Sequence, residues 1–171
     1  NAACLRLVDL LAESPAEIIM TGDNFSSDVQ SPRFLRQWSA PYYEEAIRRL
    51  HAAGKCVAVH IDGQLRGLLD AFAGIGADCA DAVTPRPMGD LTPPQCRDEA
   101  GPDMILSGGI CPTLWLPDAD EEAFRRAVRD WLALARQSPR LIAAAGDQVP
   151  PGAVEDRIRL ARDMVEELGR Y

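Results

Sequence analysis

A histidine and two aspartates stand where a parallel sheet could bring them into one site. His60 and Asp62 come at the end of the apolar run Cys56–Val59, and Asp147 follows a second apolar run, 141–145. One imidazole and two carboxylates can exchange protons with a substrate, or hold Zn²⁺ or a harder divalent ion with open coordination positions. We therefore consider His60, Asp62 and Asp147 as candidate catalytic and metal-binding residues.

The same three residues also have an ordinary structural interpretation. His60 could bond to a backbone carbonyl, Asp62 could cap the next helix, and Asp147 could lie in a turn. Both interpretations stay open at this stage. The other histidine, His51, stands beside Arg48 and Arg49 in a helical stretch, and we expect it to be a solvated surface residue.

Two further groups of polar residues follow strand-like runs. Asp23 and Asn24 come after the run 18–20, where the carboxylate could accept a proton and the amide could orient a substrate; an Asx turn is the alternative. Arg86 follows the run Cys79–Thr84. Its planar guanidinium could bind a substrate carboxylate, although an exposed loop arginine is the alternative.

Glycines and an amide complete the set of candidates. Gly108 and Gly109 follow Ser107, and without side chains they could let backbone N–H groups approach an anion. Gln148 follows Asp147. We consider Gly108, Gly109 and Gln148, together with Asn24 and Arg86, as candidate substrate-binding residues. The sequence contains no H-E-x-x-H, G-x-S-x-G or P-loop pattern.

The elements that must position these residues alternate between short apolar runs and longer helical stretches, which indicates an α/β fold. The expected strands are Glu17–Met20, Cys56–His60, Cys79–Thr84, Met104–Ser107 and Leu141–Ala145. A helix is expected from Ser31 to Gly54, broken near Pro41. The segment from Thr84 to Pro94 is rich in proline and is expected to be a long surface loop.

Three more helices follow from the spacing of apolar residues. Their expected buried stripes are Leu65, Leu68, Leu69 and Phe72; Phe124, Val128, Trp131 and Ala135; and Ile158, Ala161, Val165 and Leu168. Asp118 with Glu121 resembles the capping box at the start of the second of these helices. Five βα units suit either an open doubly wound sheet or part of a (β/α)8 barrel, which needs about 250 residues.

Composition limits the classes of function. The 171 residues carry 18 Lys and Arg against 26 Asp and Glu, a net charge of −8, which disfavours a nucleic-acid partner. The length suits a single domain over residues 1–171. No apolar run approaches the ~18 residues of a membrane span, and five scattered cysteines suggest reduced thiols in a cytoplasmic protein. Because the sequence starts with Asn1 inside an apolar stretch, we expect a fragment of a longer protein.

An ordered set of short motifs resembles the C-terminal half of the uroporphyrinogen decarboxylase superfamily. The motifs are Gln30-Ser31-Pro32-Arg33-Phe34, Pro41-Tyr42-Tyr43, Gly54-Lys55, His60-Ile61-Asp62-Gly63, Ser107-Gly108-Gly109, Gly146-Asp147-Gln148-Val149-Pro150-Pro151 and Glu167-Leu168-Gly169-Arg170-Tyr171. The resemblance covers nearly the whole chain and implies a (β/α)8 TIM barrel. This chain would supply about the last five βα units of that barrel.

The superfamily includes methyltransferases that move a methyl group between a small substrate and a cobalamin or a thiol coenzyme. Those enzymes bind Zn²⁺ through a His-x-Cys pair and a later cysteine. Here the matching positions are His60, Asp62 and Asp147. Carboxylates replace both thiolates, which favours a harder divalent ion than Zn²⁺, or none. The resemblance therefore implies metal-assisted methyl transfer from a small methylated substrate to a corrinoid or related acceptor, with a corrinoid protein as a possible partner.

Two other functions follow from the same resemblance. One is uroporphyrinogen decarboxylase itself, which uses no cofactor in porphyrin biosynthesis; that enzyme carries a Gly-His pair where this sequence has Gly146-Asp147. The other is a non-catalytic half barrel that covers its open sheet edges by pairing with another chain, for example as a homodimer.

Overall fold

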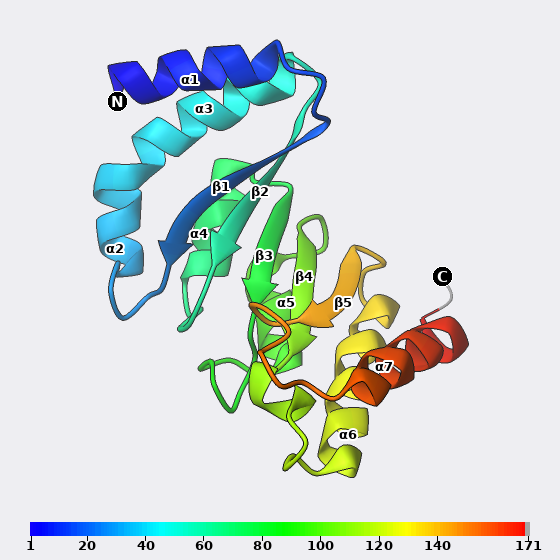
Figure 1. Cartoon of the computed structure of the whole chain (residues 1–171). Coiled ribbons are helices and arrows are strands. Elements are labelled where there is room, and N and C mark those ends of the chain that lie inside the picture. The colour runs from blue at the N-terminus through cyan, green and yellow to red at the C-terminus, as the bar shows by residue number, and fades with distance from the viewer. Residues whose placement is uncertain (170–171) are drawn as a thin grey trace.

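The computed structural model describes residues 1–169 and alternates strands with helices along the chain (Figure 1). The strands are β1 (Ile18–Phe25), β2 (Cys56–Ile61), β3 (Cys79–Val83), β4 (Ile105–Ile110) and β5 (Leu141–Ala145). The α-helices are α1 (Ala2–Ala12), α2 (Pro32–Phe34), α3 (Ala40–Ala52), α4 (Leu68–Ile75), α5 (Pro93–Ala100), α6 (Glu121–Leu132) and α7 (Glu155–Leu168). A π-helical segment covers Leu35–Ser39, and 3-10 turns cover Pro112–Trp115 and Ala133–Arg136.

The strand order decides between the two expected architectures. All neighbouring strands are parallel, and their order in the sheet is β1-β2-β3-β4-β5, the same as in the sequence. A doubly wound sheet reverses its strand order at a switch point, whereas a (β/α)8 barrel adds each strand beside the previous one. The sheet is therefore part of a TIM barrel, with β1 and β5 as its edges.

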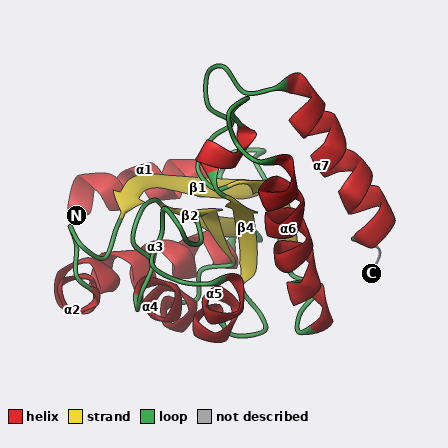
Figure 2. Cartoon of the chain, turned by 90° about the horizontal axis from the view of Figure 1, so that it is seen from below, coloured by secondary structure: helices red, strands yellow, loops and turns green. Residues whose placement is uncertain are grey.

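Helices cover one face of the sheet. Figure 2 shows α3, α4 and α5 side by side along this face. The strand residues that point toward them are fully buried: Val57, Val59 and Ile61 each have 0% exposure. The helical stripe predicted from the sequence is confirmed for Leu68, Leu69 and Phe72, which are buried in the same core; Leu65 is buried there too but lies before the start of α4.

The opposite face of the sheet is only partly covered. Strand pairing places Met20, Ala58 and Cys79 in one row, and His60 beside Asp81 one step further along the strands. On the two edge strands this face is open: Met20 is 55% exposed and Ile142 is 50% exposed. In a complete barrel this would be the inner face.

The helix after β1 contains the expected irregularity. Ser31 caps its start, accepting a hydrogen bond from the backbone N–H of Phe34 at 3.2 Å. The chain then passes through the π-helical segment into α3, which has Pro41 in its first turn. The distortion lies on the N-terminal side of Pro41 because proline has no N–H to donate to the carbonyl one turn earlier.

Two predicted details of the C-terminal helices are wrong. Asp120, not Asp118, caps α6, and its carboxylate accepts from the N–H groups of Glu122 and Ala123. A turn closed by the N–H of Ala119 keeps Asp118 outside the helix.

In α7 the buried residues are Arg157 and Met164, whereas Ile158, expected in the stripe, is 48% exposed. Ala161 and Val165, in the middle of the expected stripe, are partly buried against the core, whereas Leu168 at its end is exposed like Ile158. The Arg157 guanidinium packs over the ring of Phe124, 5.2 Å from its centre. Phe124, Val128 and Trp131 are buried as predicted, but Ala135 lies beyond the end of α6.

The first strand is longer than predicted. β1 runs to Phe25 instead of ending at Met20, so Asp23 and Asn24 lie inside the strand and not after it. Strand pairing with β2 continues as far as Phe25 beside Ile61, after an irregularity that begins at Thr21.

All five cysteines are free thiols, as expected. None of the helices within residues 1–169 is long and apolar enough to cross a membrane.

Candidate active site

His60 lies near the carboxyl end of β2 with both ring nitrogens facing carboxylates. Its Nδ1 is 3.0 Å from Oδ2 of Asp81, and its Nε2 is 3.7 Å from Oδ1 of Asp147. Because a carboxylate can only accept, Nδ1 carries the proton in the shorter contact, which presents Nε2 toward Asp147. The side chain of His60 is 19% exposed, so the ring is largely enclosed by its neighbours.

Asp81 is a site residue that the sequence analysis missed. It lies in β3 directly beside His60 in the strand pairing, and its other oxygen, Oδ1, accepts a hydrogen bond from Ser107 Oγ at 3.2 Å. A carboxylate in the middle of an apolar strand was the available signal. Ser107 lies within β4, so three neighbouring strands form one hydrogen-bonded chain, Ser107–Asp81–His60.

Asp81 is followed by an unusual backbone conformation. Ala82 has a φ of 65°, the left-handed region that side chains other than glycine rarely adopt, and the pairing of β3 with β4 shifts between Ala80 and Val83. Such residues cost on the order of 1–2 kcal/mol and tend to occur at functional sites. The carbonyl of Ala82 accepts from the buried hydroxyl of Thr84 at 3.1 Å.

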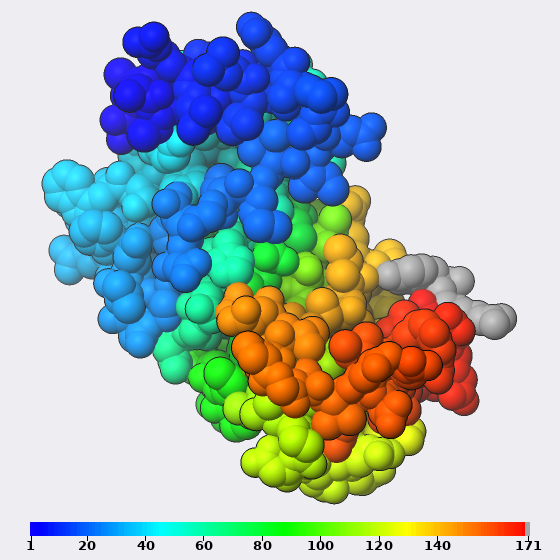
Figure 3. Space-filling view, in the orientation of Figure 1, coloured from blue at the N-terminus to red at the C-terminus, as the bar shows by residue number. Residues whose placement is uncertain are grey.

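Beside His60, a pocket of about 260 Å³ opens between four loops. Its lining comes from the segments after β2, β3, β4 and β5: Asp62, Gly63, Thr84, Met88, Pro112, Asp147, Gln148 and Pro150. Figure 3 shows these segments gathered on one face, with the orange residues after β5 against the green residues after β2 and β3. In a barrel the carboxyl end of the strands is where active sites lie.

The structure therefore brings together four of the predicted site residues. His60 and Asp147 face each other, while Asp62, Asp147 and Gln148 line the pocket. Of the structural alternatives considered for His60, a bond to a backbone carbonyl is not what the structure shows, since its partners are carboxylates.

The glycines of the site have packing reasons of their own. A Cβ on Gly146 would lie 2.0 Å from Thr84 Oγ1, a Cβ on Gly108 would lie 2.4 Å from the Val83 carbonyl oxygen, and one on Gly109 would lie 2.1 Å from the ring of Trp131. Gly108 and Gly109 are buried inside β4 rather than in a loop after it. The absence of side chains at these positions is thus explained by close packing between strands and helix.

Asp23 lies in a different environment from His60. Its carboxylate accepts a hydrogen bond from the Tyr43 hydroxyl of α3, and burial together with this bond raises the pKa of Tyr43. Asp23 lines a separate, mainly apolar cavity of about 200 Å³ between α1, β1 and α3. Asn24 is exposed in β1.

Arg86 is not directed into the pocket. Its Nε donates to the carbonyl of Asp90 at 3.0 Å, within the loop between β3 and α5, and the residue is exposed. The other histidine, His51, lies at the opposite end of the sheet. It is at the surface, as expected, and its Nε2 is 2.8 Å from Oδ2 of Asp78.

The predicted metal triad is not assembled. Within residues 1–169, no group of three or more histidine, cysteine, aspartate and glutamate side chains is close enough to hold a metal ion. His60 and Asp147 form a pair. Asp62 lines the pocket, but within residues 1–169 it makes no close contact with either of them. The described residues do not fit a metal held by these three side chains, and a divalent ion stays a prediction from the sequence.

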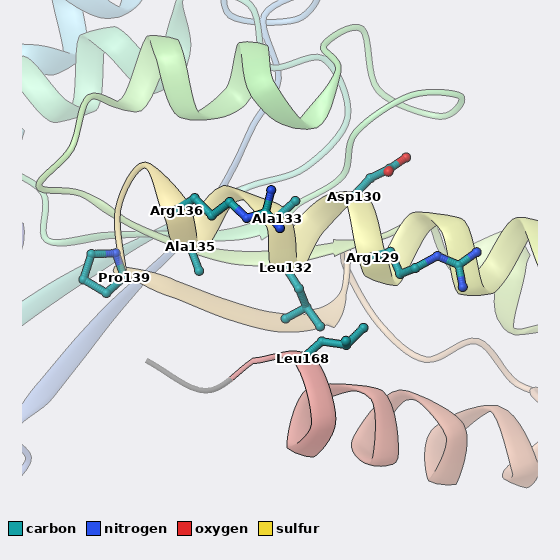
Figure 4. A pocket seen from close by; sticks show the side chains of 8 residues that line it. All are labelled: Arg129, Asp130, Leu132, Ala133, Ala135, Arg136, Pro139 and Leu168. Carbon is teal, nitrogen blue, oxygen red and sulfur yellow. The ribbon is translucent and has the colours of Figure 1, made fainter.

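A hollow of about 900 Å³ lies elsewhere, between α6, the 3-10 turn after it and α7. Leu132 and Leu168 point toward each other across it, whereas Asp130 points away (Figure 4). It is remote from the carboxyl ends of the strands, and we do not assign the active site to it.

Three comparisons with known proteins bear on this geometry. The family model described as uroporphyrinogen decarboxylase (URO-D) matches residues 1–168. The chain belongs to the uroporphyrinogen decarboxylase family. A solved structure of a methyltransferase from Methanosarcina mazei superimposes with a TM-score of 0.71 at 18% identity, covering 96% of this chain and 47% of that chain. No curated protein matches.

The structural likeness supports the fold of this URO-D family member. It confirms that the five βα units correspond to part of a TIM barrel, and the chain spans about half the length of the methyltransferase structure it matches. At 18% identity the likeness extends to the fold, not to the reaction.

Proposed function

We propose that this URO-D family member is an enzyme that transfers a methyl group from a small methylated substrate to a corrinoid or related acceptor. The observation that carries the proposal is the line Asp81–His60–Asp147 beside a pocket with carboxylates and no lysine or arginine in its lining. The neighbouring structure is a methyltransferase, which points in the same direction.

The chain's own residues divide the work as follows. Asp81 fixes the ring of His60 through Nδ1, and Ser107 fixes Asp81. His60 then presents Nε2 to Asp147. When both ring nitrogens carry a proton, Nε2–H can donate to this carboxylate and hold it in place, or pass the proton to a bound molecule. Asp62, Asp147 and Gln148 bind and orient the methyl-bearing substrate in the pocket, and Met88, Pro112 and Pro150 exclude water from it.

Methyl transfer requires that the leaving atom keep both electrons of the broken bond. The acceptor, a reduced corrinoid or a thiolate, attacks the methyl carbon as a nucleophile. The leaving heteroatom departs as a neutral group either when it receives a proton or when it was a cation at the start. A histidine that can supply a proton and carboxylates that can hold a cation suit these two requirements.

The decarboxylase is the less favoured alternative. Its substrate carries many carboxylates, and two uncompensated aspartates in the pocket would repel them. The arginine expected to bind a carboxylate, Arg86, donates to a backbone carbonyl instead. If the purified protein released CO2 from uroporphyrinogen, the decarboxylase would become the favoured function.

We further propose that other strands cover the open face of this half barrel, either from a longer chain or from a second copy. Within residues 1–169 the edge strands β1 and β5 each have a neighbouring strand on one side only, and Ile18 and Met20 are more than half exposed on β1. Sedimentation velocity is the test: a dimer, or a longer chain that is monomeric, supports the proposal, and a folded monomer of these 171 residues opposes it.

The experiment for methyl transfer uses a panel of methylated amines, thioethers and ethers with reduced cobalamin as the acceptor. We expect transfer from at least one donor, and a loss of about 10²-fold or more in His60→Ala. His51→Ala is the matched control, because His51 contacts Asp78 away from the pocket. No transfer from any donor would overturn the proposal. Elemental analysis of wild type and His60→Ala tests the predicted divalent ion separately.

A further inference from the structure

The pocket near His60 contains two carboxylates, Asp62 and Asp147, and within residues 1–169 neither has a lysine or arginine partner. The Asp62 side chain has no hydrogen bond or ion pair within residues 1–169, and the Asp147 carboxylate has one contact, with His60 at 3.7 Å. Both carboxylates line the same cavity of about 260 Å³. Their unused acceptor oxygens therefore face a space that a small molecule can enter.

Basic residues near the pocket are engaged elsewhere. Arg86 donates to the Asp90 carbonyl, and Arg66 lies 3.5 Å from the Asp90 carboxylate. Since two like charges beside a partly desolvated cavity attract a counter-charge, the electrostatics favour a cation and disfavour an anion as the bound molecule.

Apart from these carboxylates and the Gln148 amide, the side chains of the lining are apolar or already hydrogen-bonded. Met88, Pro112 and Pro150 offer C–H and thioether surface, and the Thr84 hydroxyl is engaged by the carbonyl of Ala82. A bare, strongly hydrated ion could exchange its water for oxygens of Asp62, Asp147 and Gln148, but would meet apolar walls on its other sides. A cation that carries its own methyl groups would pack on them, with its charge near Asp62 and Asp147.

We infer that this pocket binds a methylated ammonium group, an inference that rests on the proposed methyl transfer and names its substrate class. The new bond forms between the nucleophilic acceptor, a thiolate or a reduced corrinoid, and the methyl carbon. The C–N bond breaks with both electrons staying on nitrogen, and a neutral amine leaves. No proton is needed, so with such a substrate His60 is a positioning residue that holds Asp147.

Isothermal titration calorimetry with two isosteric probes tests the charge requirement. Choline carries a trimethylammonium group, and 3,3-dimethylbutan-1-ol has the same shape without the charge. We expect choline to bind and the neutral alcohol to bind at least tenfold more weakly. Added salt should weaken choline binding and leave the alcohol unchanged.

Variants locate the binding. Asp62→Asn and Asp147→Asn should each weaken choline binding several-fold, and His60→Gln should weaken it less than Asp147→Asn. Asp118→Asn is the matched control, because Asp118 is exposed and outside the pocket lining. Far-ultraviolet circular dichroism of each variant checks that it is folded.

The outcomes separate this inference from the proposed function. Equal binding of choline and its neutral isostere, or choline binding that is unaffected in both aspartate variants, overturns the inference. So does the finding that Mg²⁺ or Zn²⁺ alone binds at Asp62 and Asp147 while choline does not. If neutral ethers or thioethers donate methyl groups and choline does not bind, the inference fails and the proposed function stands. If no methylated compound donates, the proposed function fails.

Discussion

The cavity near His60 and the cavity beside Asp23 contain residues that were predicted from the same feature of the sequence, a polar residue near the end of a strand. The first is lined by loops after four strands and contains carboxylates that have no lysine or arginine partner within residues 1–169. The second lies between α1, β1 and α3, is mainly apolar, and its carboxylate is already bonded to Tyr43. A polar residue at a strand end thus marks a site only when its hydrogen-bonding capacity is still free.

The two regions also differ in the chain of groups behind the polar residue. His60 is backed by Asp81 and Ser107 on adjacent strands, a layered arrangement that fixes its orientation. Asp23 is backed by a tyrosine that is itself packed against Phe25 and Phe72 in the core. The first arrangement suits chemistry on a bound molecule, and the second suits anchoring α3 to β1.

The largest expected effect comes from Asp81→Asn. An asparagine amide can turn its NH2 toward Nδ1 and favour the other tautomer of His60, so methyl transfer should fall by about 10²-fold. The measurement is kcat and KM separately, with a pH profile. Asp23→Asn is the control and should change neither by more than about twofold. Similar losses in both variants would remove the distinction between the two regions.

Next in size is Gly146→Ala. The added methyl would lie within 2.0 Å of Thr84 Oγ1, and we expect a loss of about 1–3 kcal/mol in the free energy of unfolding. Because Asp147 is the next residue, activity should fall as well. Urea unfolding monitored by circular dichroism gives the first value. Gly152→Ala in the same loop, where a Cβ meets nothing within 4 Å but φ is +84°, separates backbone strain from the clash.

A smaller effect is expected for Tyr43→Phe at the other cavity. It removes the hydroxyl that Asp23 accepts from and should cost about 1 kcal/mol of stability, with methyl transfer unchanged. Tyr42→Phe serves as the control, since no hydrogen bond from its hydroxyl is found within residues 1–169. A loss of activity in Tyr43→Phe would mean that the Asp23 region takes part in the reaction.

The smallest effect concerns the Cys79 thiol, two residues before Asp81. Burial, followed by the charges of Asp81 and Asp78, raises its pKa to about 12. The thiol therefore stays protonated at pH 8, with roughly one molecule in 10⁴ as thiolate, and becomes reactive only as the pH rises toward 12. Iodoacetamide at pH 8 should label the exposed Cys4 and Cys56 first.

Asp81→Asn sharpens the same measurement. Removing the charge of Asp81 lowers the pKa of Cys79, so alkylation of this thiol should accelerate while that of Cys4 stays the same. Unchanged labelling of Cys79 would show that burial alone controls its reactivity and that the Asp81 carboxylate is screened from it.

The sequence by itself determined the fold class, most of the helices and strands, and the site residues that follow β2 and β5. Apolar runs separated by amphipathic stretches indicate βα units whatever their neighbours. The local position of a residue relative to a strand was enough to predict His60 near the end of β2 and Asp62, Asp147 and Gln148 after strands. In the C-terminal helix the periodicity predicted the partly buried Ala161 and Val165, but it did not predict the burial of Arg157 over Phe124, because a charged side chain is not expected in an apolar stripe.

Only the tertiary structure decided which strand ends meet. The order of strands in the sheet selects the barrel over the doubly wound sheet, and the register between β2 and β3 sets Asp81 beside His60. The packing of α3 against β1 brings Tyr43 to Asp23, and within residues 1–169 Asp62 does not join His60 and Asp147 in a metal triad. These are contacts between residues 20 or more positions apart, and local sequence patterns fix the direction of a side chain but not the partner that it meets.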